Sequence, residues 1–233
     1  MTTQPNTGRR KTLLAWSSGK DSAWALHLLR QSAEFEPVAL VSTVDAASGS
    51  VSMHGTGREL LAAQARETGL PLWEARIPWP CSNAQYETAM EAVCERAHRE
   101  GINTIAFGDL FLEDIRSYRE GRMRGTGVTP VFPLWGLDTA KLARDMIASG
   151  LKARVVSVDL ARLPASFAGR ELDLEFLEQL PAGADPCGEN GEFHTFAYDG
   201  PVFQHPIAFT CGAPVSCGGF ARAELRIASA VGC

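Results

Sequence analysis

The feature that most constrains how this chain can fold is a short polar loop between an apolar run and an amphipathic segment. Residues 12–16, Thr-Leu-Leu-Ala-Trp, have the continuous apolar character of a buried strand. Residues 22–31 then carry apolar side chains at helical spacing. A strand that turns this tightly into a helix is typical of α/β proteins with a parallel sheet. The loop consists of Ser17, Ser18, Gly19, Lys20, Asp21 and Ser22.

The rest of the first half continues the alternation of strands and helices. This pattern predicts a doubly wound parallel sheet, a Rossmann-type α/β fold, over residues 12–135. Gly69 is placed to end one helix as a left-handed C-cap. The predicted elements are strands at 37–44, 70–75 and 104–107 and helices at 58–68 and 85–99.

The second half has a different texture. Residues 128–134 and 154–158 predict strands, with a helix over 138–149 between them. From about Gly183 onward, proline, glycine and aromatic residues separate short β-like runs. We therefore predict a smaller C-terminal α+β domain over residues 136–233, packed against the first. The polar residues 1–11 lack an apolar core and predict a disordered tail rather than a signal peptide.

The Ser17–Ser22 loop has the chemistry of a phosphate site. The backbone N–H groups that begin a helix are unpaired, and the helix dipole adds partial positive charge. Gly19 allows the backbone to approach a phosphate, and Lys20 supplies a positive charge. Asp21 would repel phosphate by itself, which predicts that it holds a Mg²⁺ ion bridging the phosphates. Hydroxyl donors come from Ser17, Ser18 and Ser22.

Two other interpretations of this loop compete with the phosphate site. The loop of P-loop NTPases needs an upstream glycine and a serine or threonine directly after the lysine. Here Asp21 follows Lys20, and no glycine precedes Gly19 at the required spacing. The second alternative is a serine-rich turn whose side chains only cap the following helix.

Composition and charge exclude several classes of protein. Hydrophobic residues make up 45% and charged residues 21%, as in ordinary globular proteins. A net charge of −5 disfavours a surface built for nucleic acid. No apolar run approaches the ~18 residues that span a membrane, and the six cysteines form no C-x-x-C pair. We therefore predict a cytoplasmic protein without a disulfide framework. A solvated helix face is the favoured interpretation of the basic cluster Arg116, Arg119, Arg122 and Arg124.

The Ser17–Ser22 loop resembles that of the N-type ATP pyrophosphatase superfamily, which reads S-G-G-x-D-S. This sequence departs from it at Ser18, where the family has glycine. The resemblance implies that the chain binds ATP, and that an oxygen nucleophile attacks the α-phosphorus and releases pyrophosphate.

Two later stretches narrow the resemblance to the diphthine–ammonia ligase family, including its bacterial relatives. They are Gly108-Asp109 with the later Pro133-Leu134-Trp135, and the run Cys187-Gly188-Glu189-Asn190-Gly191-Glu192-Phe193-His194-Thr195. With the loop, the resemblance covers about residues 12–203. It implies an ATP-dependent ligase that adenylates a carboxylate substrate for capture by ammonia. The protein substrate of that family is diphthine, a modified histidine of translation elongation factor 2.

This sequence departs from the eukaryotic and archaeal pattern of the family in two places. After Asp109 it reads Leu-Phe-Leu-Glu-Asp-Ile-Arg-Ser-Tyr-Arg-Glu instead of a serine–tyrosine–glutamine run. Phe193-His194-Thr195 stands where Tyr-Glu-Thr is common. The resemblance to the family therefore supports the adenylation reaction more strongly than it supports the identity of the carboxylate substrate.

Further polar residues are expected at the same edge of the sheet, because open α/β sheets bind ligands outside the carboxyl ends of their strands. Asp45 follows a predicted strand and would accept from ribose or adenine, or else cap the strand end. Asp109 would bind Mg²⁺ or substrate, with Gly108 permitting close approach, or else form a turn. His54 stands at a loop-to-helix junction suited to the nucleotide, although Thr56 as an N-cap explains that junction equally well.

The late segment supplies the other candidate catalytic residues beside Lys20. Glu189, Glu192 and His194 lie within a few positions of one another. In an extended segment Glu192 and His194 point to one face, which would suit orienting ammonia or stabilising the adenylating transition state. The alternative is a solvated hairpin with a turn at Asn190-Gly191.

Two other functions stay open. An AMP-forming sulfur-transfer enzyme, such as a tRNA thiolase, would want paired reactive cysteines and a basic RNA surface, and neither is evident. A non-catalytic ATP- or AMP-binding module would have little use for both Lys20-Asp21 and the late Glu/His cluster.

Overall fold

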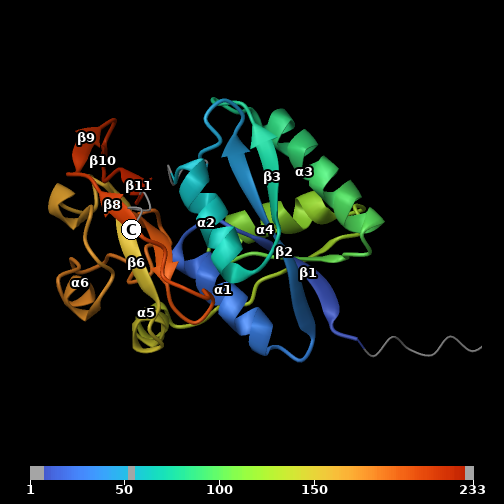
Figure 1. The fold of residues 1–233 in the computed structure, drawn as a ribbon, viewed down its shortest axis with the longest axis horizontal. Helices are drawn as coiled ribbons and strands as arrows, with labels where there is room; N and C mark the ends of the chain where they lie inside the picture. The colour runs from blue at the N-terminus through green and yellow to red at the C-terminus, as the bar shows by residue number, and fades with distance from the viewer. Residues whose placement is uncertain (1–7, 52–55, 229–233) are drawn as a thin grey trace, which may run out of the picture.

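The structure is a computed structural model that describes residues 8–51 and 56–228. Its first part is a five-stranded sheet of order β3-β2-β1-β4-β5 in which all neighbours run parallel. The predicted doubly wound α/β fold is therefore confirmed (Figure 1). The strands are β1 (Arg10–Ala15), β2 (Phe35–Asp45), β3 (Leu72–Ile77), β4 (Thr104–Ala106) and β5 (Thr129–Val131).

Alternation along β1 divides the core into two layers. Leu14 is fully buried in the cluster that contains α1 and α2, whereas the neighbouring Leu13 is fully buried in the cluster that contains α3. Helices thus cover both faces of the sheet, as Figure 1 shows. The helices of this part are α1 (Lys20–Gln31), α2 (Arg58–Thr68), α3 (Asn83–Arg99) and α4 (Glu113–Met123). Gly69 ends α2 with a φ of 69°, the left-handed C-cap that the sequence predicts.

The second part is built on antiparallel strands. A four-stranded sheet has the order β7-β6-β10-β9, and β8 pairs with β11. The predicted smaller α+β region is confirmed, and it lies beside α1 and α2 in Figure 1. Its elements are α5 (Thr139–Ala148), β6 (Lys152–Asp159), α6 (Leu174–Glu178), β7 (Phe193–Asp199), β8 (Phe209–Cys211), β9 (Val215–Cys217), β10 (Phe220–Arg222) and β11 (Leu225–Ile227).

The strand order reverses between β1 and β4, and this position fixes the site. From β1 the chain proceeds outward to β2 and β3, then returns to the other side of β1 as β4. The loops after β1 and β4 therefore diverge and leave a crevice at the carboxyl ends of the strands. The Ser17–Ser22 loop and Gly108-Asp109 follow these two strands.

The start of β1 differs from the predicted one. β1 begins at Arg10, so Arg10 and Lys11 belong to the sheet rather than to the polar tail. Pairing with β2 explains this, because Arg10 lies opposite Phe35 in the parallel ladder. Among the described residues, no helix has both the length and the apolar character needed to cross a bilayer.

Candidate active site

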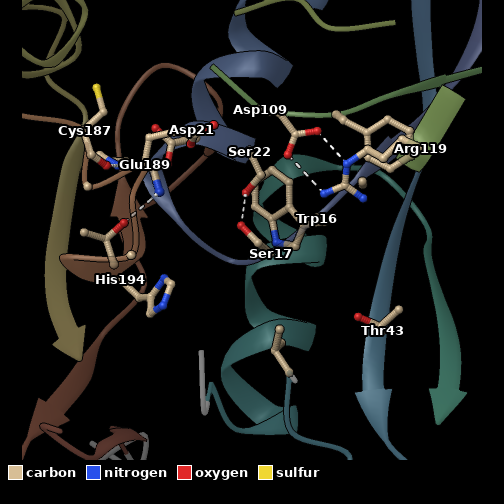
Figure 2. Close-up of a pocket in the computed structure, with 18 of the residues that line it drawn as sticks. Trp16, Ser17, Asp21, Ser22, Thr43, Asp109, Arg119, Cys187, Glu189 and His194 are labelled. Atoms are coloured by element: carbon tan, nitrogen blue, oxygen red, sulfur yellow. Dashed lines mark hydrogen bonds and ion pairs between the residues drawn. The ribbon is translucent and has the colours of Figure 1, made fainter. Parts of the chain in front are cut away.

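A cavity of about 370 Å³ opens at the crevice between β1 and β4. Figure 2 shows Trp16, Ser17 and Ser22 between two groups of side chains, with Asp21 and Glu189 on one side and the Asp109–Arg119 pair on the other. The residues predicted from the sequence that line this cavity are Ser17, Lys20, Asp21, Ser22, Gly108, Asp109, Glu189 and His194.

The backbone of the loop is held by the second sheet. The Ala197 N–H of β7 donates to the Ser18 carbonyl at 2.9 Å, and the Lys20 N–H donates to Thr195 Oγ1 at 3.1 Å. A Cβ at Gly19 would lie 3.2 Å from the Thr195 carbonyl oxygen. The glycine thus allows β7 to approach the loop, a close contact that the sequence did not indicate.

Ser18 does not present its hydroxyl to the cavity. Its side chain is fully buried, and its Oγ lies 2.7 Å from Thr56 Oγ1. Ser18 also has a φ of 71°, in the left-handed region that glycine adopts without steric strain. This backbone angle accounts for the glycine that the S-G-G-x-D-S pattern has at the same place.

The helix-capping interpretation of the loop does not hold. Gly19 is the N-cap of α1 and has no side chain to cap it, and the side chain that accepts from the first N–H of the helix is Thr195 of β7 rather than a serine or aspartate of the loop. Ser22 instead donates to the Gly19 carbonyl at 2.9 Å and accepts from Ser17 at 3.3 Å. Ser17 lines the cavity, and its hydroxyl also accepts from the Gly19 N–H at 3.4 Å.

Lys20 places a buried ammonium at the floor of the site. Its side chain is 2% exposed, and Nζ donates to Asp21 Oδ2 at 2.8 Å and to the Cys187 carbonyl. Burial is the largest single influence and by itself would lower the pKa of Lys20, but the charge and hydrogen bond of Asp21, together with Cys187 and Asp185, outweigh it and raise the pKa. The ammonium is therefore fixed in its charged form between the loop and the Cys187 segment.

The two carboxylate oxygens of Asp21 differ in their partners. Oδ2 pairs with Lys20, while Oδ1 is buried and has no hydrogen-bond partner among the described residues. Burial raises the pKa of Asp21, and the Lys20 charge counteracts this rise. A buried, unpartnered carboxylate oxygen is a ligand of the kind that a hard cation prefers.

Glu189 crosses from the late segment to the far side of the crevice. Its Oε1 accepts from the Leu110 N–H at 2.7 Å, just beyond Asp109. Burial raises the pKa of Glu189 to about 7, with the nearby charges of Asp21 and Asp109 adding to the rise. Burial also lowers the pKa of His194, so its imidazole is neutral at pH 7.

Glu192, unlike His194, does not line the cavity. Glu192 directly precedes β7, which begins at Phe193, and its carbonyl accepts from the Asp159 N–H at 3.0 Å. Its side chain is 1% exposed, outside the cavity lining, and Oε1 accepts from the Asp185 N–H and from Asn190 Nδ2, both at 3.1 Å. Glu192 thus braces the loop that carries Glu189.

Asp45 and His54 are not placed at the site. Asp45 accepts hydrogen bonds from the Ser48 N–H and hydroxyl, both at 2.7 Å, and lies outside the cavity lining. The structure therefore supports the strand-end cap that was the alternative for Asp45. His54 lies outside the described residues.

Arg119 is a site residue that the sequence did not reveal. It pairs with both oxygens of Asp109, at 2.5 and 3.1 Å, and its guanidinium lies 4.2 Å from the Phe107 ring centroid. The solvated-face interpretation is wrong for this residue, since Arg119 lines the cavity. A usable signal was Met123, the one buried residue of α4, four positions later on the same helical face.

The acidic side chains at the cavity differ in how well they suit Mg²⁺. The described ranges contain no group of three or more histidine, cysteine or acidic side chains arranged around one metal position. Mg²⁺ commonly takes only one or two protein carboxylates and completes its shell with phosphate oxygens and water. Asp21 fits that pattern through Oδ1, whereas both oxygens of Asp109 are engaged by Arg119.

Several named proteins are similar to this chain. Diphthine–ammonia ligase of Mus musculus is 28% identical over 155 residues, covering 64% of this chain and 56% of the relative. The enzyme of that name from Danio rerio is 30% identical, covering 65% of each. That of Schizosaccharomyces pombe is 26% identical, covering 86% of this chain and 36% of the relative. The chain thus spans about half the length of the mouse relative.

A solved structure and two family models complete the comparison. The U34-tRNA thiolase NcsA from Methanococcus maripaludis aligns with a TM-score of 0.39 and 16% identity, covering 62% of this chain and 59% of that one, too distant to support an argument. The diphthamide synthase N-terminal domain matches residues 10–130, and the diphthamide synthase C-terminal domain matches residues 138–213. Together these two matches span both parts of the fold, and the chain belongs to the diphthamide synthase family.

Proposed function

We propose that this chain is an ATP-dependent amide ligase that adenylates a carboxylate, releases pyrophosphate and transfers the acyl group to ammonia. One observation carries the proposal. The Ser17–Ser22 loop and the Cys187–Thr195 segment face a single cavity at the carboxyl edge of a parallel sheet. Membership of the diphthamide synthase family and the name of the relatives support the same reaction.

The cavity offers suitable surfaces for both ends of ATP. Its volume of about 370 Å³ lies in the range of small-molecule sites. The Lys20 ammonium and the start of α1 provide positive potential for the triphosphate. Trp16, Val41 and Val51 line another part of the wall and provide apolar contact for the adenine ring.

Asp21 is our proposed protein ligand for Mg²⁺, through its unpartnered Oδ1. When bound, the ion would neutralise charge that builds up on the phosphates as pyrophosphate leaves. We do not assign this role to Asp109, because its pairing with Arg119 already satisfies both of its oxygens.

In the first step a substrate carboxylate oxygen attacks the α-phosphorus of ATP. The new oxygen–phosphorus bond forms as the bond to the β-phosphate oxygen breaks, giving an acyl-adenylate and pyrophosphate. No proton is transferred in this step, so the contribution of the chain is positioning and charge stabilisation. Lys20 is the residue assigned to the charge that develops on the leaving pyrophosphate.

In the second step ammonia attacks the acyl carbon, and AMP leaves. The nitrogen must lose a proton to become an amide, which requires a base near the acyl group. Glu189 has a pKa of about 7, so its carboxylate is a competent acceptor near neutrality. The neutral imidazole of His194 lines the same cavity and is the second candidate.

The chemistry of Cys187 weighs against the sulfur-transfer alternative. Of the cysteines that the structure describes, it is the one that lines the cavity. Burial raises the pKa of Cys187 to about 12, so its sulfur is a thiol rather than a nucleophilic thiolate.

Replacing Lys20 tests the proposal. Lys20→Met keeps an unbranched side chain of similar length but removes the charge, and AMP formation should fall about 100-fold or more. ATP–pyrophosphate exchange and AMP release would be measured with a panel of carboxylic acids and ammonium. Lys141→Met is the matched control, because Lys141 is an exposed lysine on α5 whose ion pair is with Asp145.

Circular dichroism and thermal unfolding would establish that both variants are folded. Near-wild-type AMP formation by folded Lys20→Met would refute the loop assignment. If Lys20→Met does not fold, Asp21→Asn serves instead, because it keeps the size of the side chain and should lose the dependence of the reaction on Mg²⁺.

A further inference from the structure

A second cavity, of about 240 Å³, lies between α3 and α4. It shares part of its lining with the nucleotide cavity, so the two are neighbours rather than separate sites. The residues that line both are Tyr86, Met90, Phe107 and Arg119. One end of a molecule bound in the second cavity would therefore lie next to the place of the proposed adenylation.

The floor of this cavity is apolar, and its rim is charged. Met90, Cys94, Phe107 and Met123 are all buried and line it from α3, from the loop after β4 and from the end of α4. At the rim an ion pair joins Arg122 of α4 to Glu87 of α3. This pair ties the two helices together, which favours an occupant small enough to enter beneath the rim.

Arg119 stands at the boundary of the two cavities with its orientation fixed. Asp109 binds Nε and one Nη, and Phe107 lies against the guanidinium plane. A hydrogen bond from Arg119 also opposes the rise that burial causes in the pKa of Tyr86. A guanidinium group has N–H donors beyond these, and a second carboxylate is the acceptor that fits them best.

We propose that the second cavity binds the body of the substrate, and that the substrate is a small carboxylic acid with an apolar body. Arg119 holds the carboxylate of this acid at the edge of the nucleotide cavity, within reach of the α-phosphorus. This inference rests on the proposed function, because it names the class of carboxylate that the ligase would adenylate.

Gly121 provides a way to fill the cavity without disturbing the fold. It lines the cavity from α4, and a Cβ added there would meet no other atom within 4 Å. Gly121→Phe should therefore block the cavity, whereas Gly121→Ala adds little volume and improves helix propensity. Neither substitution touches the nucleotide cavity.

Two measurements test the proposal with hexanoate, benzoate and phenylacetate as probes. Calorimetric titration without ATP measures binding, with the alcohol corresponding to each acid as the uncharged control. Steady-state AMP formation then gives KM separately for acid and for ATP. We expect at least one acid to bind and its alcohol to bind much more weakly. We also expect Gly121→Phe to raise the KM for that acid about tenfold or more, with the KM for ATP unchanged in both Gly121 variants.

Arg119→Lys tests the carboxylate contact. It keeps the charge but loses the planar fork, so the KM for the acid should rise about tenfold while the KM for ATP stays the same. An equal rise in the KM for the acid and in the KM for ATP would mean that Arg119 only supports the fold around Asp109. That result would overturn its role as the anchor of the carboxylate.

The outcomes separate this inference from the proposed function. If a small acid supports AMP formation and Gly121→Phe leaves its KM unchanged, the cavity assignment fails and the ligase stands. If an acid binds with the expected dependence on Gly121 but never yields AMP, the cavity stands and the ligase fails. If none of the acids binds and only a protein-borne carboxylate supports AMP formation, the proposed class of substrate is wrong.

Discussion

Glu189 is the residue through which pH acts most directly on this site. With a pKa of about 7 it is half protonated near neutrality, whereas an ordinary glutamate is already ionised. The carboxylate form is the one that can accept a proton, so the rate of ammonia capture should rise as pH increases through about 7. Glu189→Gln keeps an acceptor for the Leu110 N–H, and should be about 100-fold slower without that rise.

Single-turnover amide formation from the acyl-adenylate would measure this effect, at a fixed concentration of free ammonia. Stability provides a second readout. The pKa of Glu189 is higher in the folded chain than its ordinary value of 4.5, so the folded state binds this proton more tightly. The free energy of unfolding should therefore fall as pH rises from about 4.5 to about 7, and fall less in Glu189→Gln. Identical slopes in the two proteins would contradict the raised pKa.

Sequence alone predicted those cavity-lining residues whose position follows from the backbone around them. Lys20 and Asp21 were identified because a strand, a turn and a helix fix where they point. The surroundings of Arg119 and Glu192 were not predictable, because they depend on tertiary neighbours. Arg119 meets Asp109 across a crevice, and Glu192 turns inward to the Asp185 N–H. Neither contact can be predicted from the spacing of residues in the local sequence.

The loop before β7 has a geometry that is sensitive to substitution. Gly188 has a φ of 70°, and a Cβ there would lie 2.9 Å from the Phe193 carbonyl oxygen. Its neighbour Cys187 provides the carbonyl that accepts from Lys20 Nζ. Gly188→Ala should therefore displace that carbonyl, with a clear loss of AMP formation and of stability.

Gly183→Ala is the matched control for this loop. Gly183 also has a positive φ, 94°, but a Cβ there would have no neighbour within 4 Å. Both variants carry a left-handed alanine, which costs about 1–2 kcal/mol. Any additional loss in Gly188→Ala, measured by urea unfolding, would report the contact with Phe193. Equal losses would show that this contact is relieved at no cost.

The parallel strands and their helices were predictable because each carries its own periodicity. The ends of the strands were less predictable, because pairing with neighbouring strands determines them. For example, β1 includes Arg10 because Arg10 pairs with β2. β8 to β11 are three residues each, too short for an alternation to develop. β9 and β10 pair locally, but β10 also pairs with β6, which is far away in the chain.

At the scale of the whole molecule, Gln64 joins the two parts of the fold. Its side chain is fully buried on α2, and its Nε2 donates to the Ser18 carbonyl at 2.9 Å and to the Ala197 carbonyl at 2.6 Å. Its Oε1 accepts from Trp16 Nε1 at 2.8 Å. One amide thus connects the end of β1, the phosphate loop and β7.

Gln64→Leu keeps the volume of the side chain but removes these hydrogen bonds. Buried polar partners left unpaired should lower the free energy of unfolding by about 1–3 kcal/mol, and ATP should bind more weakly. Gln31→Leu is the control, since Gln31 lies exposed at the end of α1. Urea unfolding would be followed by tryptophan fluorescence and by far-UV circular dichroism. Because Gln64 joins the two parts, we expect both signals of the wild type to follow one transition, and separate transitions would contradict this.

On the proposed function, the contact of β7 with the Ser17–Ser22 loop also determines when the chain becomes able to bind ATP during its synthesis. The strands and helices of the parallel sheet all precede β7 on the ribosome. The Ser18 carbonyl and the Lys20 N–H, however, receive their partners from Ala197 and Thr195. A nascent chain with a complete parallel sheet would still lack these partners. We therefore expect nucleotide affinity to appear late in translation, after β7 has emerged.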